Sequence, residues 1–291
     1  MTTKSSLSGH AAMFLFAALI SVSFSLGDLA APHIEPAALT AARFALAAVI
    51  IGALAAPHMQ WAHFRAAWRY MFVGGLLALY FITMFEALRL TDPVSTAAIF
   101  TLTPIMAACF GWMLMRQITT LRMAFALLLA GSGALWVVFR GDMAALLGLN
   151  LGPGERIFLL GCALHAFYTP LSRLLNRGEP LLVYSFGGIV GGLTVTAIYG
   201  LGDVVATDWI ALPLVAWAAV VYLAVSATAV TFFLLQFATL RLPAAKVMAY
   251  SYLVPSFVIL WEGFLGHGWV AGQVWIGVGL TITALLLLLR D

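Results

Sequence analysis

Apolar runs of about 20 residues recur from one end of this chain to the other. Runs of that length are typical of helices that cross a lipid bilayer, because ~20 residues of α-helix span the ~30 Å hydrocarbon core. Of the 291 residues, 64% are hydrophobic and 9% are charged, whereas about 25% are charged in a soluble domain. A water-soluble fold could not bury so much apolar surface. The sequence therefore predicts an all-α integral membrane protein.

Charged residues and segments containing Pro or Gly divide the chain into ten predicted transmembrane helices. Their approximate ranges are 9–30, 36–56, 69–90, 94–115, 121–139, 156–176, 181–201, 213–238, 244–265 and 270–289. The connections between them are too short to hold a folded soluble domain. We therefore expect one integrated transmembrane domain.

Lys and Arg residues gather on one side of the predicted helices, and short loops retain these residues on the cytoplasmic side. An even number of helices places both termini on that side. We expect an inner-membrane protein with both termini in the cytoplasm. The basic residues predicted on the cytoplasmic side are Lys4, Arg65, Arg69, Arg116, Arg122, Arg173, Arg177, Arg241, Lys246 and Arg290, and those on the opposite side are Arg89, Arg140 and Arg156.

The two halves of the chain resemble each other when they are aligned. An offset of 144 residues pairs Ser21 with His165 and Glu35 with Glu179, and a slightly larger offset pairs Pro104 with Pro255. We predict a duplication into repeats of residues 1–145 and 146–291. Because each repeat holds five helices, an odd number, the second repeat enters the membrane inverted relative to the first. Such a pair of repeats can open a site between them to either side in turn.

The order of helices and three segments carry a resemblance to a known family. The segments are Ala42-Arg43-Phe44, "EALRLTDPVSTAAIFTLTP" and "FATLRLPAAKVMAYSYLVP", the last two ending in Pro104 and Pro255. With them the chain resembles the drug/metabolite transporter superfamily, in particular its ten-helix EamA-like branch and the YddG-type exporters of aromatic and other apolar amino acids. The resemblance implies a central cavity lined by the first, third, fourth, sixth, eighth and ninth helices, and implies export.

Polar and aromatic residues at mid-depth are the candidates for that cavity, since an ionisable group in hydrocarbon normally faces protein or water. His165, Tyr168 and Ser172 share one face of their predicted helix. His165 either binds the substrate or joins neighbouring helices by hydrogen bonds, and a proton-coupling role stays open. The predicted substrate-binding residues are Ser21, Phe24, Tyr80, Thr83, Phe100, Thr103, His165, Tyr168, Tyr222, Ser226, Tyr250, Ser251 and Tyr252.

Pro104 and Pro255 are predicted hinges, because proline interrupts the helical hydrogen-bond ladder. Glu86 is a gating candidate that can also pair with Arg89 one turn away. Arg43 either pairs with an acidic group on another helix or extends toward an interface. The resemblance places its helix outside the cavity lining, which favours a structural role.

Several function classes do not fit the sequence. The sequence has no basic cluster with interleaved aromatics, which would indicate a nucleic-acid partner. It has no ATP-binding loop and no metal-ligand spacing that would indicate a cofactor. It also has no His-Glu-x-x-His motif that would indicate an intramembrane enzyme. Scarcity of deep basic residues disfavours phosphorylated cargo. We predict an alternating-access exporter of aromatic and other apolar, zwitterionic amino acids or similar metabolites. A multidrug or amine efflux carrier and a channel-like uniporter stay open, and we expect a monomer.

Overall fold

The computed structural model describes residues 3–91, 93–139, 141–144, 152–266, 268–269 and 271–289. Every regular element in these ranges is helical, as the apolar runs predict, because a helix satisfies its own backbone groups where no water is present. The boundary predicted between the repeats, at residues 145 and 146, lies outside the described residues. The longer α-helices are α1 (Thr3–Ala30), α2 (Pro36–Ala55), α3 (Trp68–Leu88), α5 (Thr103–Met115), α6 (Leu121–Val138), α8 (Pro153–Leu175), α9 (Leu181–Tyr199), α11 (Leu214–Ala224), α14 (Val254–Phe264) and α15 (Val274–Leu289).

Shorter helices complete the described elements. They are α4 (Pro93–Phe100), α10 (Leu201–Ala206), α12 (Thr231–Thr239), α13 (Ala244–Ala249), a π-helix (Val225–Val230) and three 3₁₀ turns (Ala56–His58, Trp61–Phe64 and Tyr250–Leu253). Within the described residues, seven helices are long and apolar enough to cross a membrane, and α5, α6 and α15 are shorter apolar helices.

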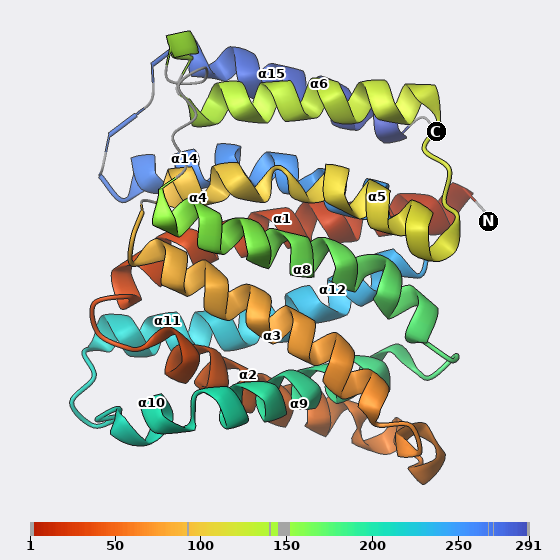
Figure 1. Cartoon of the computed structure of the whole chain (residues 1–291), viewed down its shortest axis with the longest axis vertical. Helices are drawn as coiled ribbons and strands as arrows, with labels where there is room; N and C mark the ends of the chain where they lie inside the picture. The colour runs from red at the N-terminus through yellow and green to blue at the C-terminus, as the bar shows by residue number, and fades with distance from the viewer. Residues whose placement is uncertain are drawn as a thin grey trace.

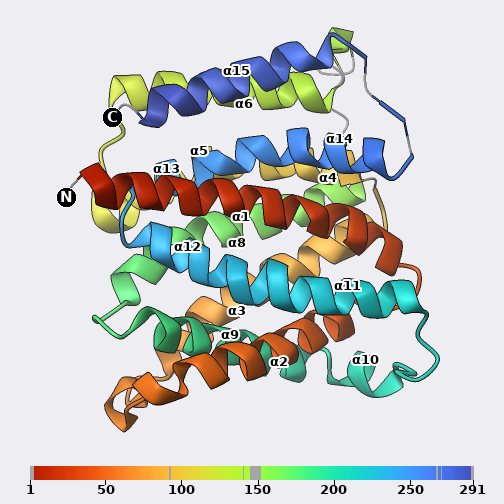
Figure 2. The ribbon, with the colours of Figure 1, turned by 180° about the vertical axis from the view of Figure 1, so that it is seen from behind.

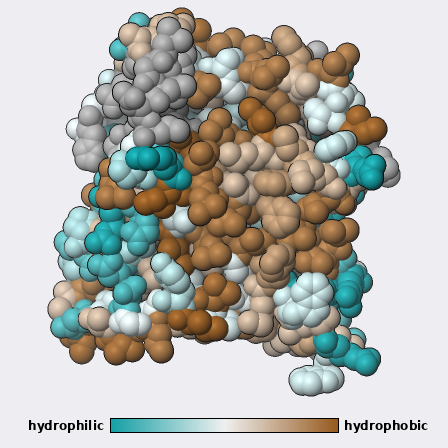
Figure 3. Space-filling view, in the orientation of Figure 1, coloured by the Kyte–Doolittle hydropathy of each residue, from teal (hydrophilic) through white to brown (hydrophobic). Residues whose placement is uncertain are grey.

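The helices lie side by side in a stack, with α6 and α15 at one edge and α2 and α9 at the other (Figure 1). Between the edges lie α1, α3, α8, α11 and α12, and both ends of the chain lie at the same end of the helices in both views (Figure 2). Hydrophobic residues form a broad central region on the face shown, with hydrophilic residues toward the helix ends (Figure 3). This distribution matches a layer of hydrocarbon between two aqueous sides.

Three segments that read as continuous apolar runs are interrupted. The backbone between α4 and α5 turns at Thr101 and Leu102, directly before Pro104. A 3₁₀ turn separates α13 from α14 directly before Pro255, and the π-helix joins α11 to α12. The interruptions expected near Pro104 and Pro255 are observed, whereas neither α11 nor the π-helix that follows it contains a proline.

Glycines let α3 and α9 approach closely, as the Gly187-Gly188 and Gly191-Gly192 pattern predicts. A Cβ on Gly74 of α3 would overlap the backbone of Gly188 and Gly192, so the two backbones are in contact there. A Cβ on the neighbouring Gly75 would meet only the Val195 side chain, at 3.0 Å. The crossing therefore depends on Gly74 rather than on glycine in general.

Ion pairs hold both ends of α3. At the end of α3 that lies on the side of the chain termini, Arg69 Nη2 lies 2.5 Å from Glu179 Oε1, and Arg69 also donates to the Leu175 carbonyl. At the opposite end, Arg89 Nη1 lies 2.5 Å from Glu35 Oε2 and 4.0 Å from Glu86. The Arg69–Glu179 side chains are 3% and 5% exposed, whereas those of Arg89 and Glu35 are 39% and 51% exposed.

Gly74→Ala should lower the thermal unfolding temperature sharply, because the new Cβ has backbone rather than a movable side chain in its way. Gly75→Ala is the matched control, with the same gain in helix propensity and a change in stability of at most about 1 kcal/mol. Differential scanning fluorimetry of the two purified variants makes the comparison. Equal melting temperatures would show that the backbones can separate without cost.

Glu179→Gln should destabilise the protein by about 3 kcal/mol at pH 7, because it leaves a buried arginine unpaired. Glu35→Gln, which breaks the exposed pair at the other end of α3, should cost about 1 kcal/mol or less.

The cost of Glu179→Gln should also depend on pH. Burial opposes the charged carboxylate, but hydrogen bonds from Arg69 and from the Arg177 backbone outweigh it and hold the pKa of Glu179 below its ordinary value. A lowered pKa stabilises the folded state above the unfolded-state pKa of about 4.3, and that stability disappears as pH falls through the folded-state value. The gap in unfolding free energy between wild type and Glu179→Gln should narrow below about pH 4. A gap independent of pH would contradict the pairing.

Candidate functional site

A cluster of aromatic rings around His165 occupies the middle of the bundle. We define this central cluster as Phe24 of α1, Tyr80 of α3, Phe100 of α4, and Phe158 and His165 of α8. The His165 ring centroid lies 4.5 Å from that of Tyr80 and 5.6 Å from that of Phe100. Tyr80 also contacts Phe100 and Phe158, at 5.9 and 5.8 Å. Every member is at most 1% exposed.

His165 is buried without a polar partner. Neither ring nitrogen has a hydrogen-bond partner among the described residues. A neutral imidazole carries one donor and one acceptor, and leaving a buried polar group unsatisfied costs ~1–3 kcal/mol. The expectation that His165 faces inward is confirmed. For the alternative role of His165, hydrogen bonding between helices, the described residues supply no partner.

A small cavity lies beside His165. It is lined by residues of α1, α3, α8, the π-helix and α12, and its volume is about 10 Å³. A cavity needs ~10–15 Å³ to hold one water molecule, so in this arrangement it could not admit an amino acid. The lining residues are Phe16, Ile20, Leu77, Phe81, His165, Ala227, Thr228, Thr231, Phe232 and Leu235.

Arg43 of α2 reaches the same cavity wall from behind. Its side chain is fully buried, and its Nε donates to Thr228 Oγ1 at 2.7 Å while Nη2 donates to the Ala227 carbonyl at 2.6 Å. The guanidinium carbon lies 3.8 Å from the Phe81 ring centroid. Burial of Arg43 contradicts the expected extended position at an interface, and no acidic partner for it is found among the described residues. The interrupted backbone of the π-helix offers acceptors that a regular helix would use internally.

A second hydrogen-bonded group lies toward the end of the bundle that holds the chain termini. Gln236 of α12 donates to the Tyr168 hydroxyl at 2.9 Å and accepts from Ser172 Oγ at 2.8 Å. The Tyr168 ring lies nearly parallel to that of His165, with centroids 6.1 Å apart. Tyr168 therefore joins the central cluster to this polar group.

Five other predicted residues use their hydroxyls within or between helices. Thr83 and Thr103 donate to backbone carbonyls of their own segments. Tyr222 donates to the Leu19 carbonyl of α1, and Ser251 lies 3.5 Å from the Phe100 carbonyl. Ser21 accepts from the Trp261 indole at 2.8 Å, which joins α1 to α14.

The remaining predicted residues lie apart from the cluster. Tyr250 bonds with His10 at 3.0 Å near the start of α1, and the Tyr252 ring packs beside Gly131 of α6. Ser226 is half-buried in the π-helix. Pro104 and Pro255 are the second residues of α5 and α14, and Glu86 lies beside Arg89 at the far end of α3.

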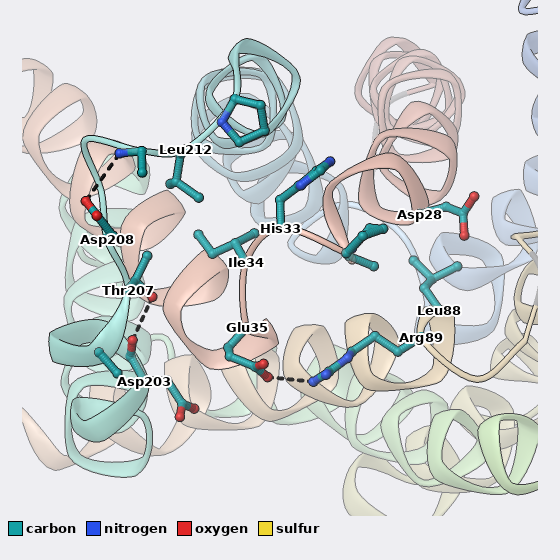
Figure 4. A pocket seen from close by; sticks show the side chains of 15 residues that line it. Asp28, His33, Ile34, Glu35, Leu88, Arg89, Asp203, Thr207, Asp208 and Leu212 are labelled. Atoms are coloured by element: carbon teal, nitrogen blue, oxygen red, sulfur yellow. Dashed lines mark hydrogen bonds and ion pairs between the residues drawn. The ribbon is translucent and has the colours of Figure 1, made fainter.

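An open vestibule of about 900 Å³ lies at the end of the helices opposite the termini (Figure 4). Asp28, Glu35, Asp203 and Asp208 line it together with Arg89, which pairs with Glu35. Asp208 accepts from the Ala211 backbone N–H at 3.2 Å. The vestibule is therefore predominantly acidic.

Sequence reasoning missed Arg43, Gln236 and Glu262 as site candidates. Ser25 donates to Glu262 Oε1 at 2.5 Å, which places a half-buried carboxylate inside α14. A signal for all three was available, since each is a strongly polar residue within an apolar run. Within the described residues, no group of three His, Cys, Asp or Glu side chains could hold a metal ion.

Comparisons with known proteins agree with this architecture. The chain is 23% identical over 282 residues to "Uncharacterized transporter YyaM" of Bacillus subtilis (strain 168), covering 93% of this chain and 90% of that protein. A crystal structure of a protein with 20% sequence identity superimposes with a TM-score of 0.75 over 99% of each chain, which shows a shared fold.

A family model matches nearly the whole chain, in two segments. Residues 7–139 and residues 152–290 each match the model of the EamA-like transporter family. The matched ranges contain the apolar helices and the central cluster. The chain therefore belongs to the EamA-like transporter family and is a multi-pass membrane transporter.

Proposed function

We propose that the protein is a carrier that exports aromatic and other apolar amino acids, or similar small metabolites, by alternating access. The observation that carries this proposal is the buried ring of aromatic side chains around His165. Aromatic walls favour a flat apolar side chain, and the unpartnered imidazole can exchange hydrogen bonds with a polar substrate group.

An inverted pair of five-helix repeats is the architecture that we propose for this carrier. The family model matches the chain twice. The contacts between the halves also come in matching pairs. α3 packs on α8 as its counterpart α12 packs on α1, and α5 packs on α8 as its counterpart α14 packs on α1. Equivalent helices pair as α2 with α9 and α6 with α15. Glu35 and Glu179, which the aligned halves equate, bind opposite ends of α3.

Closure on both sides of the cavity favours a carrier over a channel. Phe24 and Phe85 occupy the turns of α1 and α3 between the cavity and the vestibule, and both are at most 1% exposed. Phe85 packs against Gly27 of α1. On the other side, the Tyr168–Gln236–Ser172 group and the Arg69–Glu179 pair join the helices. A channel would need both layers open together, whereas a carrier opens them in turn.

An amine efflux carrier is the second candidate, since the acidic vestibule would attract cations. The attraction acts at the entrance, whereas selection depends on the central cavity. Tryptamine beside L-tryptophan in a transport assay separates the two candidates.

The side of each loop is testable by labelling. Because basic residues gather at the end that holds the termini, we propose that this end is cytoplasmic and that the protein lies in the inner membrane. In a background without native cysteines, Gly202→Cys should react with an impermeant maleimide in intact cells, whereas Gln60→Cys should react only after permeabilisation. Both positions are exposed. Terminal tags found on different sides of the membrane would overturn the inverted repeat.

Transport by the central cluster is testable in liposomes. Wild-type protein should show saturable counterflow of radiolabelled L-tryptophan, and His165→Ala and Tyr80→Ala should each lower it at least about tenfold, since about 1.4 kcal/mol of lost binding corresponds to tenfold. Tyr199→Ala, which removes an exposed tyrosine at the end of α9, is the matched control. Gel filtration confirms that each variant is folded. Intact saturable flux in His165→Ala, Tyr80→Ala and Tyr252→Ala would refute the site, and flux without counterflow would favour a channel.

A further inference from the structure

Arg43 carries a buried charge for which the described residues supply no carboxylate partner. Its side chain is fully buried, and no ion pair joins it to an acidic residue in the described ranges. Arg69, by contrast, is equally removed from solvent but is paired with Glu179. An uncompensated charge in a low-dielectric interior is costly, so such residues normally pair or face a functional cavity.

The guanidinium of Arg43 is held by the wall of the central cavity. Thr228 and Ala227 accept its hydrogen bonds, and Phe81 stacks against it. All three also line the cavity, together with His165. Nη1 of Arg43 has no hydrogen-bond partner among the described residues, and neither ring nitrogen of His165 has one. Arg43 itself does not line the cavity, but it bonds directly to two residues that do, and His165 belongs to the same lining.

The chemistry of these groups selects an anionic partner. A guanidinium is always charged, donates only, and matches the two oxygens of a carboxylate. An imidazole can add a donated hydrogen bond, whereas the Thr228 hydroxyl already donates to the Leu223 carbonyl and accepts from Arg43. A primary ammonium offers donors only, so it would leave the donors of Arg43 unsatisfied and would be repelled by its charge.

We propose that Arg43, assisted by His165, binds the carboxylate of the substrate, so that the carrier accepts aromatic and apolar molecules with a carboxylate and rejects those that carry only an amine. This inference rests on the proposed function, because it places the substrate in the central cavity. The cavity must widen to admit a carboxylate, and the π-helix on its wall is an irregular segment at which the backbone can adjust.

Three ligands with the same indole ring test the inference on the wild-type protein: L-tryptophan, indole-3-propionate and tryptamine. The concentration of indole-3-propionate that halves the counterflow of radiolabelled L-tryptophan should lie within about tenfold of that of unlabelled L-tryptophan. Tryptamine should need a concentration at least about 100-fold higher, which corresponds to a binding free-energy difference of ~2.7 kcal/mol. Tryptamine that competes as well as L-tryptophan would overturn the inference, and so would indole-3-propionate that fails to compete.

Substitutions of Arg43 test whether this residue causes the preference for carboxylates over amines. Arg43→Gln should reduce the preference for indole-3-propionate over tryptamine at least tenfold, and Arg43→Lys should keep part of it because the charge remains. Arg241→Gln is the matched control, because it removes an arginine that also stacks on a phenylalanine and donates to a backbone carbonyl but lies outside the cavity lining, and it should leave the preference unchanged. If Arg43→Gln does not fold, the ligand comparison in wild type and in Arg43→Lys decides.

Ligand-induced thermal stabilisation of detergent-purified protein separates this inference from the proposed function. If no saturable tryptophan flux exists but L-tryptophan and indole-3-propionate raise the melting temperature of wild type and not of Arg43→Gln, carboxylate binding holds and amino-acid transport is refuted. If tryptamine stabilises the wild type as well as the carboxylates do, or if no carboxylate stabilises it, the role of Arg43 is refuted whatever the flux.

Discussion

Polar groups in a hydrocarbon layer must find their partners inside the protein, and the structure depends on this constraint. Regular helices meet it for most of the backbone. Where a helix is interrupted, a neighbouring side chain supplies the missing bond: Arg43 donates to the π-helix, and Ser251 lies near the Phe100 carbonyl at the break between α4 and α5. The π-helix and the break between α4 and α5 therefore lie where helices meet, and the candidate site lies beside them.

The third helix connects the parts of the site. Gly74 of α3 is in backbone contact with α9. Arg69 and Arg89, at the two ends of α3, pair with Glu179 and Glu35, and Tyr80 between them packs against His165. The buried pair lies on the side of the termini and the exposed pair borders the open vestibule. The two ends of one helix thus differ in how firmly they are held. Such a difference between the two ends is what a carrier needs if its two sides are to open in turn.

Much of the fold could be predicted from the sequence because a bilayer leaves few alternatives. Apolar runs predicted the helices, the glycine pairs predicted the close contact of α9, and Pro104 and Pro255 predicted interruptions. The inward face of His165 and Tyr168 was also predicted, since a polar stripe on an apolar helix avoids lipid. Substrate-binding roles, the inverted repeat and the hinges stay predictions. For Arg43 an acidic partner or an interfacial position was considered beside a structural role, and the described residues show instead a bond to the Ala227 carbonyl, because neither local spacing nor hydropathy shows which backbone lies beside a buried side chain.

The sequence by itself determined that this protein lies in a membrane, because 64% hydrophobic residues in long runs can be accommodated only there. Helix type and the inward direction of the polar stripes follow from that, because both are local consequences of burial in lipid. Only the tertiary structure decided which polar groups meet. Arg43 and Thr228 are 185 residues apart, and Tyr80 and His165 come from different halves, so their contacts depend on how whole helices pack. Packing of that kind is set by many side chains at once, and no short segment encodes it.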